Sequence, residues 1–526
     1  MEGRLLFCLF GLLAFGGAGA ADWDGRLHVA MNSDIRSTNP GVKRDANTDT
    51  VLHHVVEALV AYDDELNVAP MLASRYEIAD DGRTYIFDLR RGVRFHNGEE
   101  MTSAHVKWSW QRYLDPATGW RCRSWYDGTG PVSVRILSIE TPSRYRVVFR
   151  LERPSYIFLH RMAHLQCITA VLHPSSVNDD GEWLRPVATG PYRLEEWRRG
   201  EYVELERFEG YRPRPEPRSG LTGRKIALAE AIRFRIVPDA AIAQAALQAG
   251  DVDVAISLPI SHYEELARAD RLEVVMQPTL GWMTLLIQTN DPLLRNPLVR
   301  RAIAHAIDRD ALAKFATKGF GVANSSAVPT YSPYYRAAFE RWHPYDPEKA
   351  RELLRRAGYG GEEIRIQTNR KHLHLYENAI VMHAMLREAG FNAKLEVLDW
   401  ASQLNNFYTG NFQLSSFDFS ARTEPFLGYG LVTRQRGTEH PWGWDNPRAT
   451  DLMRRLDSVF SIEERGRIFE KLHELLRADV PVIGLYNLHK MVVLRESLCG
   501  FEGWRLEKPR FWGVTGDCPR GAGEAE

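Results

Sequence analysis

A few histidines near carboxylates are the residues of this chain that could perform catalytic or metal chemistry. His473 and Glu474 begin like the two-histidine helix of a zinc hydrolase, but Arg477 stands where the second histidine is needed, and a guanidinium does not bind Zn²⁺. His372 and His374 lack carboxylates or cysteines at metal-ligand spacing. We therefore expect no catalytic residue, no metal site and no cofactor, and we interpret His473 as part of a solvated helix face.

Four cysteines could form disulfides, apart from Cys8 in the apolar N-terminal segment. They are Cys122, Cys167, Cys499 and Cys518. An even number favours disulfides in an oxidising compartment, and four cysteines allow three connectivities. Pairing Cys122 with Cys167 and Cys499 with Cys518 closes the shortest loops, and each bridge would stabilise the fold by roughly 3–4 kcal/mol.

The first twenty residues have the pattern of a secretory signal peptide. Arg4 precedes an apolar run from Leu5 to Phe15, and Ala18-Gly19-Ala20 matches a cleavage site. We therefore predict a signal peptide over residues 1–20 and a periplasmic location. No later segment reaches the ~20 apolar residues that a membrane span requires, so the mature chain is expected not to span a membrane.

Length and composition describe an ordinary globular protein of several domains. The 526 residues are 44% hydrophobic and 26% charged, and at ~100–200 residues per domain they suggest about three units. The formal net charge is −1, which gives no overall attraction to nucleic acid or an anionic membrane. Binding specificity must therefore come from a local site.

Alternating strand and helix patterns predict an α/β protein. Residues 232–237 resemble a strand, Asp239 can cap the following helix, Gly250 can end it, and 252–256 resemble a second strand. This order is typical of a βαβ unit. Other helices are predicted over 297–316, from Asp346 to Gly358, and over 447–478.

Several blocks, in order along the chain, resemble the extracellular solute-binding proteins of family 5, which serve peptide and nickel ABC importers. The longest is DDGRTYIFDLRRGVRFHNGEEMTSAHVKWSW, residues 80–110, and another is YDPEKARELLRRAG, residues 345–358. Further matching segments are 48–62, 69–73, 188–192, 208–211, 234–253 and 299–310. The resemblance covers essentially the whole chain after residue 20.

The resemblance implies a two-lobed α/β fold, that of a type II, cluster C-like periplasmic binding protein with an extra subdomain in the large lobe. Two crossing hinge segments, expected near 275–282 and 482–486, would let the lobes close on a ligand. The implied bounds are 21–280 for the large lobe, with the subdomain inserted at roughly 50–185, then 281–484 for the second lobe and 485–526 for the return to the large lobe.

The resemblance also indicates ligand-binding residues. In the family the loop after the first strand contacts ligand, which corresponds here to Arg44, Asp45 and Asn47. The alternative interpretation is a solvated polar loop. Trp400 matches a tryptophan that lines the peptide cavity, with a core position at a helix start as the alternative.

Arg370 and Lys371 fall where peptide-binding members place a basic residue. A guanidinium or ammonium group there could meet a ligand carboxylate. We therefore include both among the candidate ligand-binding residues.

One departure from the family concerns the ligand's amino group. Members that bind a free α-amine have an aspartate four residues before the proline of an acidic-Pro turn, and here Ala421 holds that position before Pro425. Asp418, beside Phe419, could supply a carboxylate, and Arg422 brings positive charge instead. We expect discrimination against ligands whose only polar group is a free α-amine, and binding of a carboxylate near Arg422.

We interpret the chain as the periplasmic substrate-binding subunit of a peptide-type ABC importer and not as an enzyme. It would capture a peptide or peptide-like solute by hinge closure, as a monomer, and deliver it to the inner-membrane permease. One alternative is a binding protein for a non-peptide acidic solute or a metal complex. Another is a secreted hydrolase with unrecognised carboxylates; a ligand that stabilises the protein and is released unaltered would argue against it.

Overall fold

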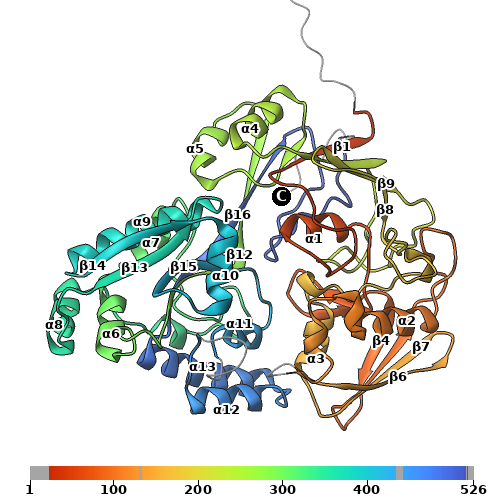
Figure 1. Ribbon diagram of the computed structural model, residues 1–526. Helices are drawn as coiled ribbons and strands as arrows, with labels where there is room; N and C mark the ends of the chain where they lie inside the picture. Colours follow the sequence, from red (N-terminus) through yellow and green to blue (C-terminus); the bar gives the residue numbers. More distant parts are fainter. Residues whose placement is uncertain (1–22, 130–132, 434–441, 517, 519–526) are drawn as a thin grey trace, which may run out of the picture.

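The computed structural model describes residues 23–129, 133–433, 442–516 and 518 (Figure 1). The predicted signal peptide, residues 1–20, lies outside this part of the chain. A ten-stranded sheet runs through both halves of the molecule. From one edge to the other, its strands are β14 (Asn392–Leu398), β13 (Glu363–Asn369), β15 (Leu414–Phe419), β12 (Leu272–Ile287), β16 (Val482–Arg495), β11 (Val254–Ala255), β1 (Arg26–Met31), β10 (Ala231–Ile236), β9 (Tyr202–Arg207) and β8 (Tyr192–Arg198).

Two long antiparallel strands, β12 and β16, connect the two halves of this sheet. In the large lobe, 272–278 pair with 489–495, and in the second lobe, 282–286 pair with 482–487. The register shifts between Pro278 and Trp282, and proline donates no backbone hydrogen bond. The ladder is therefore interrupted where the chain passes between lobes, and such an irregularity allows a strand to bend.

The parallel strands of both lobes direct their carboxyl ends toward the junction between the lobes. β11 is antiparallel to β16, which enters the large lobe from the second lobe, so β11 and its parallel neighbour β1 run toward the second lobe. β15 is antiparallel to β12, so β15 and its parallel neighbour β13 run back toward the large lobe. Ligands of open α/β sheets bind outside the carboxyl ends of strands, which makes this junction the expected site.

An inserted subdomain extends the large lobe and occupies the lower right of Figure 1. Its four-stranded sheet packs against helices, and the core between them contains buried aromatic residues such as Phe87 of the sheet and Trp110 of a helix. The elements of this part are β2 (Val60–Tyr62), β3 (Val68–Pro70), β4 (Ala73–Ile78), β5 (Thr84–Leu89), α2 (Ser103–Leu114), β6 (Ile136–Ser143), β7 (Arg146–Leu151) and α3 (Ile157–Met162).

The subdomain contains the predicted Cys122–Cys167 disulfide, with Cα atoms 5.9 Å apart. At the other end of the chain, Cys499 forms a β-bridge with Thr515, and the Cys518 Sγ lies 3.2 Å from the carbonyl oxygen of Ser497. The two C-terminal cysteines thus lie in segments that approach each other. Their pairing remains a prediction.

The helix boundaries that were predicted from capping residues are confirmed for two helices. Asp239 and Gly250 bound α4 (Ala240–Ala249), and Asp346 and Gly358 bound α8 (Pro347–Ala357) as predicted. The other helices are α1 (Ala46–Leu52), α5 (Tyr263–Leu266), α6 (Pro297–Ala306), α7 (Arg309–Ala316), α9 (Leu373–Glu388), α10 (Trp400–Thr409), α11 (Pro425–Val432), α12 (Pro447–Leu456) and α13 (Ile462–Asp479).

Two helical stretches are broken where the sequence analysis predicted continuous helices. The stretch 297–316 divides because the Asp308 side chain caps α7. The stretch 447–478 divides between α12 and α13, where Ser461 caps the second helix.

The prediction that His473 lies on a solvated helix face was also wrong. His473 is buried on α13, and its Nε2 lies 2.9 Å from the carbonyl oxygen of Arg341.

The break between α12 and α13 positions Asp457 for a second contact between the lobes, away from β12 and β16. The Asp457 carbonyl oxygen accepts the backbone N–H of Tyr156 (2.7 Å), and its carboxylate accepts the Ser155 hydroxyl (2.8 Å) and pairs with Arg153. Ile157 is buried in the core of the second lobe. The inserted subdomain thus contacts both lobes (Figure 1).

Candidate functional site

The loop after β15 brings Arg422 to the junction between the lobes. Its Nη1 donates to the carbonyl oxygens of Ser420 (2.9 Å) and Ala421 (3.0 Å), which hold the guanidinium against its own loop. Burial lowers the pKa of Arg422 to about 10; nearby Glu507 opposes this shift and Arg44 reinforces it. Arg422 therefore remains charged at neutral pH in a poorly solvated place.

Glu507 contacts both lobes at this junction, and the sequence analysis did not identify it. Its Oε1 accepts the backbone N–H of Ala421 (3.2 Å) and the hydroxyl of Thr279 on β12 (3.2 Å). Its φ of +69° lies in the left-handed region that non-glycine residues rarely adopt. Such conformations persist where the surrounding structure imposes them, often at functional sites. A Cβ on Gly281 would lie 2.5 Å from Oε1, so glycine there leaves room for the carboxylate.

The loop after β1 and the start of α1 form the large-lobe wall. Arg44 forms an ion pair with the buried Asp49. Asp45 is the N-cap of α1, and the Nδ2 of Asn47 donates to the carbonyl oxygen of Ser33 (2.8 Å). Asp45 and Asn47 therefore shape this wall, while Arg44 contributes charge to the junction.

Two lysines, the buried Lys508 and the half-buried Lys490, lie near Glu507. The Lys508 Nζ donates to the carbonyl oxygen of Ala46 at the start of α1 (3.3 Å). Lys490 is on β16, opposite Gln277 of β12. Burial lowers the pKa of Lys490 to about 8; Lys508 contributes to this shift and Glu507 opposes it. The hinge side of the junction is therefore rich in positive charge.

A second polar group lies at the carboxyl edge of the second lobe. The Asp418 carboxylate is 3.5 Å from the His374 Nε2. Burial acts to raise the pKa of Asp418, but the hydrogen bond and charge of His374 outweigh it and keep that pKa below its usual value. Trp400 is half-buried beside them, with its ring 4.6 Å from that of His372 and stacked on Phe417 at 5.8 Å. Trp400 is thus part of an aromatic group at this edge.

The remaining candidates have other surroundings. Arg370 is exposed, donates to the Tyr376 hydroxyl (3.2 Å) and lies over the Tyr376 ring. Lys371 is also exposed. Phe419 is buried in the second-lobe core, with its ring 6.2 Å from that of Trp282. The structure therefore brings Arg44 and Arg422 together at the junction, gives Phe419 a packing role, and leaves Arg370 and Lys371 solvent-exposed.

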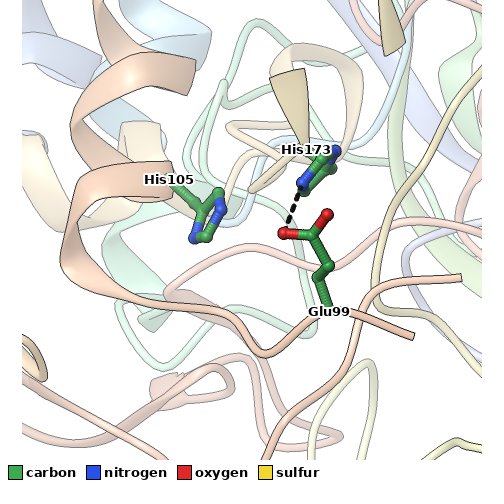
Figure 2. A group of neighbouring side chains, drawn as sticks. All are labelled: Glu99, His105 and His173. Carbon is green, nitrogen blue, oxygen red and sulfur yellow. Dashed lines mark ion pairs between the residues drawn. The ribbon is translucent and has the colours of Figure 1, made fainter. Parts of the chain in front are cut away.

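The group Glu99, His105 and His173 in the inserted subdomain has metal-ligand chemistry, and its candidate ligand atoms lie within 4.8 Å of one another (Figure 2). The His105 Nδ1 accepts the backbone N–H of Thr102 (3.0 Å), and the His173 Nδ1 accepts that of Ser175 (3.1 Å). Each neutral ring then carries its proton on Nε2, which for His173 lies 3.2 Å from a Glu99 oxygen. This arrangement makes the group a hydrogen-bonded cluster, because a metal would need the Nε2 lone pairs.

Comparison with known proteins shows which proteins this chain is similar to. The family model described as "Bacterial extracellular solute-binding proteins, family 5 Middle" matches residues 67–430. A curated relative, the glutathione-binding protein GsiB of Salmonella choleraesuis, is 29% identical over 374 residues, which are 70% of this chain and 69% of the relative. Within the described residues, no helix is both long and apolar enough to cross a membrane.

Solved structures share the fold. The periplasmic binding protein DppA from Helicobacter pylori, in complex with the peptide STSA, has a TM-score of 0.79 at 24% identity, covering 93% of this chain and 98% of its own. NikA from Brucella suis, in complex with Fe(III)-EDTA, has a TM-score of 0.80 at 21% identity, covering 93% and 99%. These matches extend the likeness in fold to nearly the whole chain.

Proposed function

We propose, because the chain belongs to the bacterial extracellular solute-binding proteins of family 5, that it is the periplasmic substrate-binding subunit of a peptide-type ABC importer. It binds its solute between the lobes and delivers it to an inner-membrane permease. The observation that carries the ligand class is the half-buried Arg422 at the junction, with Arg44 near it and Ala421 at the family's amine-binding position. The preferred ligand is a peptide or peptide-like solute that bears a carboxylate.

The carboxylate of Glu507 does not restore a site for an amine. Glu507 approaches Ala421 from the C-terminal segment, but it already faces Arg422, Lys490 and Lys508. An added ammonium would meet this positive charge, whereas a carboxylate would be attracted by it. The junction thus favours an acidic group even though it contains an acidic residue.

Binding is coupled to closure about β12 and β16. We place the hinge at 278–282 on β12 and at the facing residues 487–489 on β16, where the register of the two strands shifts. A ligand that touches both lobes stabilises the closed form, because it makes contacts there that the open form lacks. The closed form is then the one that docks on the permease.

Isothermal titration calorimetry with a defined panel tests this function. The panel contains glutathione, which the GsiB relative is named for, its C-terminal amide, the peptide Ala-Glu, its isostere Ala-Gln, and Ala-Ala amide, whose only charge is its amine. We expect the acidic members to bind more tightly than their amides, and mass spectrometry to recover them unaltered. Absence of binding by every member would contradict the proposal, and turnover of a member would favour a hydrolase.

A second candidate function is the capture of an anionic metal complex as cargo. It is favoured by the fold shared with the Fe(III)-EDTA complex of NikA and by the same excess of cations at the junction. Fe(III)-EDTA added to the panel separates the two. Tighter binding of this chelate than of every peptide would replace the peptide assignment.

A further inference from the structure

At the hinge side of the junction, positively charged groups outnumber the carboxylates. The cations are Arg44, Arg121, Arg422, Lys490 and Lys508, and the carboxylates are Asp45, Asp49 and Glu507. Arg44 is paired with Asp49. Among the described residues, Glu507 is the carboxylate that offsets the charges of both Arg422 and Lys490. A single carboxylate thus offsets two half-buried cations and part of the charge of Lys508.

The C-terminal segment fixes this arrangement against the hinge. The backbone N–H of Leu280 donates to the carbonyl oxygen of Arg505 (3.1 Å), and the Glu507 carboxylate accepts the Thr279 hydroxyl (3.2 Å). Leu280 and Thr279 are both on β12, where its ladder with β16 is interrupted. The segment that carries Lys508 is therefore fixed at the pivot of closure, where Lys490 also lies on β16.

Lys490 has a further property that a purely structural lysine would lack. It is half-buried, and within the described part of the chain its Nζ has no hydrogen-bond partner. An ammonium in such a partly desolvated place is stabilised by an anion that accepts its unused donors. Lys508 donates one of its three N–H groups to the carbonyl oxygen of Ala46. Both lysines therefore retain donors for an acceptor that the protein itself does not supply.

We propose that Lys490 and Lys508 form a second anion subsite at the hinge, which binds a second acidic group of the same ligand whose first acidic group meets Arg422. This inference rests on the proposed function and narrows it to ligands with two anionic groups. Two subsites on different segments, one beside the second lobe and one at the pivot, would also make the distance between the two acidic groups a criterion for selection.

Protonation gives the proposal a readout independent of affinity. The groups that face Lys490 are Lys508 and Glu507, and with a pKa of about 8 it is about half neutral at pH 8. An anion bound beside it favours the charged form, so binding should take up to about half a proton at that pH. Calorimetry in two buffers of different ionisation enthalpy measures this uptake.

Lys490→Met is the test variant, because methionine keeps much of the side-chain length and removes the charge. The control is Lys471→Met on the exposed face of α13. The probes are glutathione and its two monoamides, each of which lacks one carboxylate. We expect glutathione to bind native protein at least tenfold more tightly than either monoamide. In Lys490→Met, one monoamide should bind as well as glutathione while the other remains discriminated, and the proton uptake should disappear.

Two results would overturn the proposal. If Lys490→Met, folded by its thermal transition, discriminates both monoamides as native protein does, or takes up protons as native protein does, the second subsite does not exist, although the proposed function stands. If neither glutathione nor any peptide of the panel binds the native protein, both the proposed function and this inference fail. The Lys471→Met control should match the native protein in every measurement.

Discussion

Single residues at the junction set the chemistry of the ligand. Ala421 removes an aspartate that relatives use for an amine, Arg422 adds a guanidinium next to it, and Glu507 supplies a carboxylate from another segment. The cations near Glu507 outnumber it. We propose that the net effect of these residues is a site that favours acidic groups.

Replacement of Arg422 by glutamine should weaken glutathione binding roughly 10- to 100-fold, because a hydrogen bond to a charged group contributes ~1.5–3 kcal/mol. Calorimetry of the native protein and the variant measures this loss. Arg387→Gln, on the exposed end of α9, is the matched control and should bind as native protein does. Our interpretation is wrong if Arg422→Ala leaves affinity unchanged while Asp418→Ala abolishes binding of Ala-Ala amide.

Buried histidines make stability depend on pH. Burial lowers the pKa of His54 to about 4 and that of His160 to about 3. Below their ordinary value near 6.5, the unfolded chain binds protons that the folded protein does not, so the free energy of unfolding falls as the pH is lowered. Each such histidine contributes a slope of about 1.4 kcal/mol per pH unit between about pH 6.5 and its folded pKa.

Urea unfolding at pH 7.0, 6.0 and 5.0 tests this expectation. The native protein should lose stability steadily across the series. In His160→Gln the slope of the unfolding free energy against pH should be smaller, by the equivalent of up to about one bound proton. Stability that stays level or rises toward pH 5.0 would contradict a neutral, buried state of these histidines.

Among the elements, the loops after β1 and β15 contribute most to the site. Both follow strands whose carboxyl ends face the junction, and the cap of α1 by Asp45 fixes one of them. The disulfide Cys122–Cys167 and the predicted Cys499–Cys518 bridge lie elsewhere, in the inserted subdomain and near the C-terminus. The Cys122–Cys167 disulfide thus stabilises the inserted subdomain and does not involve the hinge strands β12 and β16.

Protein purified from an oxidising compartment should have no titratable thiol among Cys122, Cys167, Cys499 and Cys518. Non-reducing peptide mapping should recover the two short-range pairs. Replacing both Cys122 and Cys167 by serine should cost roughly 3–4 kcal/mol of unfolding free energy, because the bridge restricts the unfolded chain. Four reactive thiols, or a peptide that joins Cys122 to Cys499, would refute the pairing.

At the scale of the whole molecule, the lobes are joined at two places. One is the pair β12 and β16, and the other is the contact of the subdomain with Asp457. Opening about the hinge would separate the second contact, since Ser155 and Asp457 belong to different lobes. Closure therefore depends on both the ligand and this remote contact.

Small-angle scattering should show a smaller radius of gyration when saturating glutathione is added, because closure brings the lobes together. Asp457→Asn, which weakens the pairing with Arg153, should increase the radius of gyration of the ligand-free protein. A profile that glutathione leaves unchanged, with binding verified by calorimetry, would indicate a rigid, pre-closed site.

The sequence by itself determined the family, the two-lobed α/β class and the helices bounded by Asp239 and Asp346, and it favoured the Cys122–Cys167 pairing among three possible connectivities. Helix caps and turns depend on residues a few positions apart, and family blocks preserve their order along the chain. These features are therefore visible without knowledge of the path that the chain follows.

Only the tertiary structure decided which charges meet. Glu507 lies 86 residues from Ala421 in sequence and reaches it from the other lobe, and Lys490 comes near Lys508 because the C-terminal segment returns along the hinge. Asp457, at the break between α12 and α13, likewise accepts a hydrogen bond from Ser155, which is 302 residues away in the sequence. No local pattern encodes such contacts, because the electrostatic balance of a site depends on distances in space that the folded chain alone establishes.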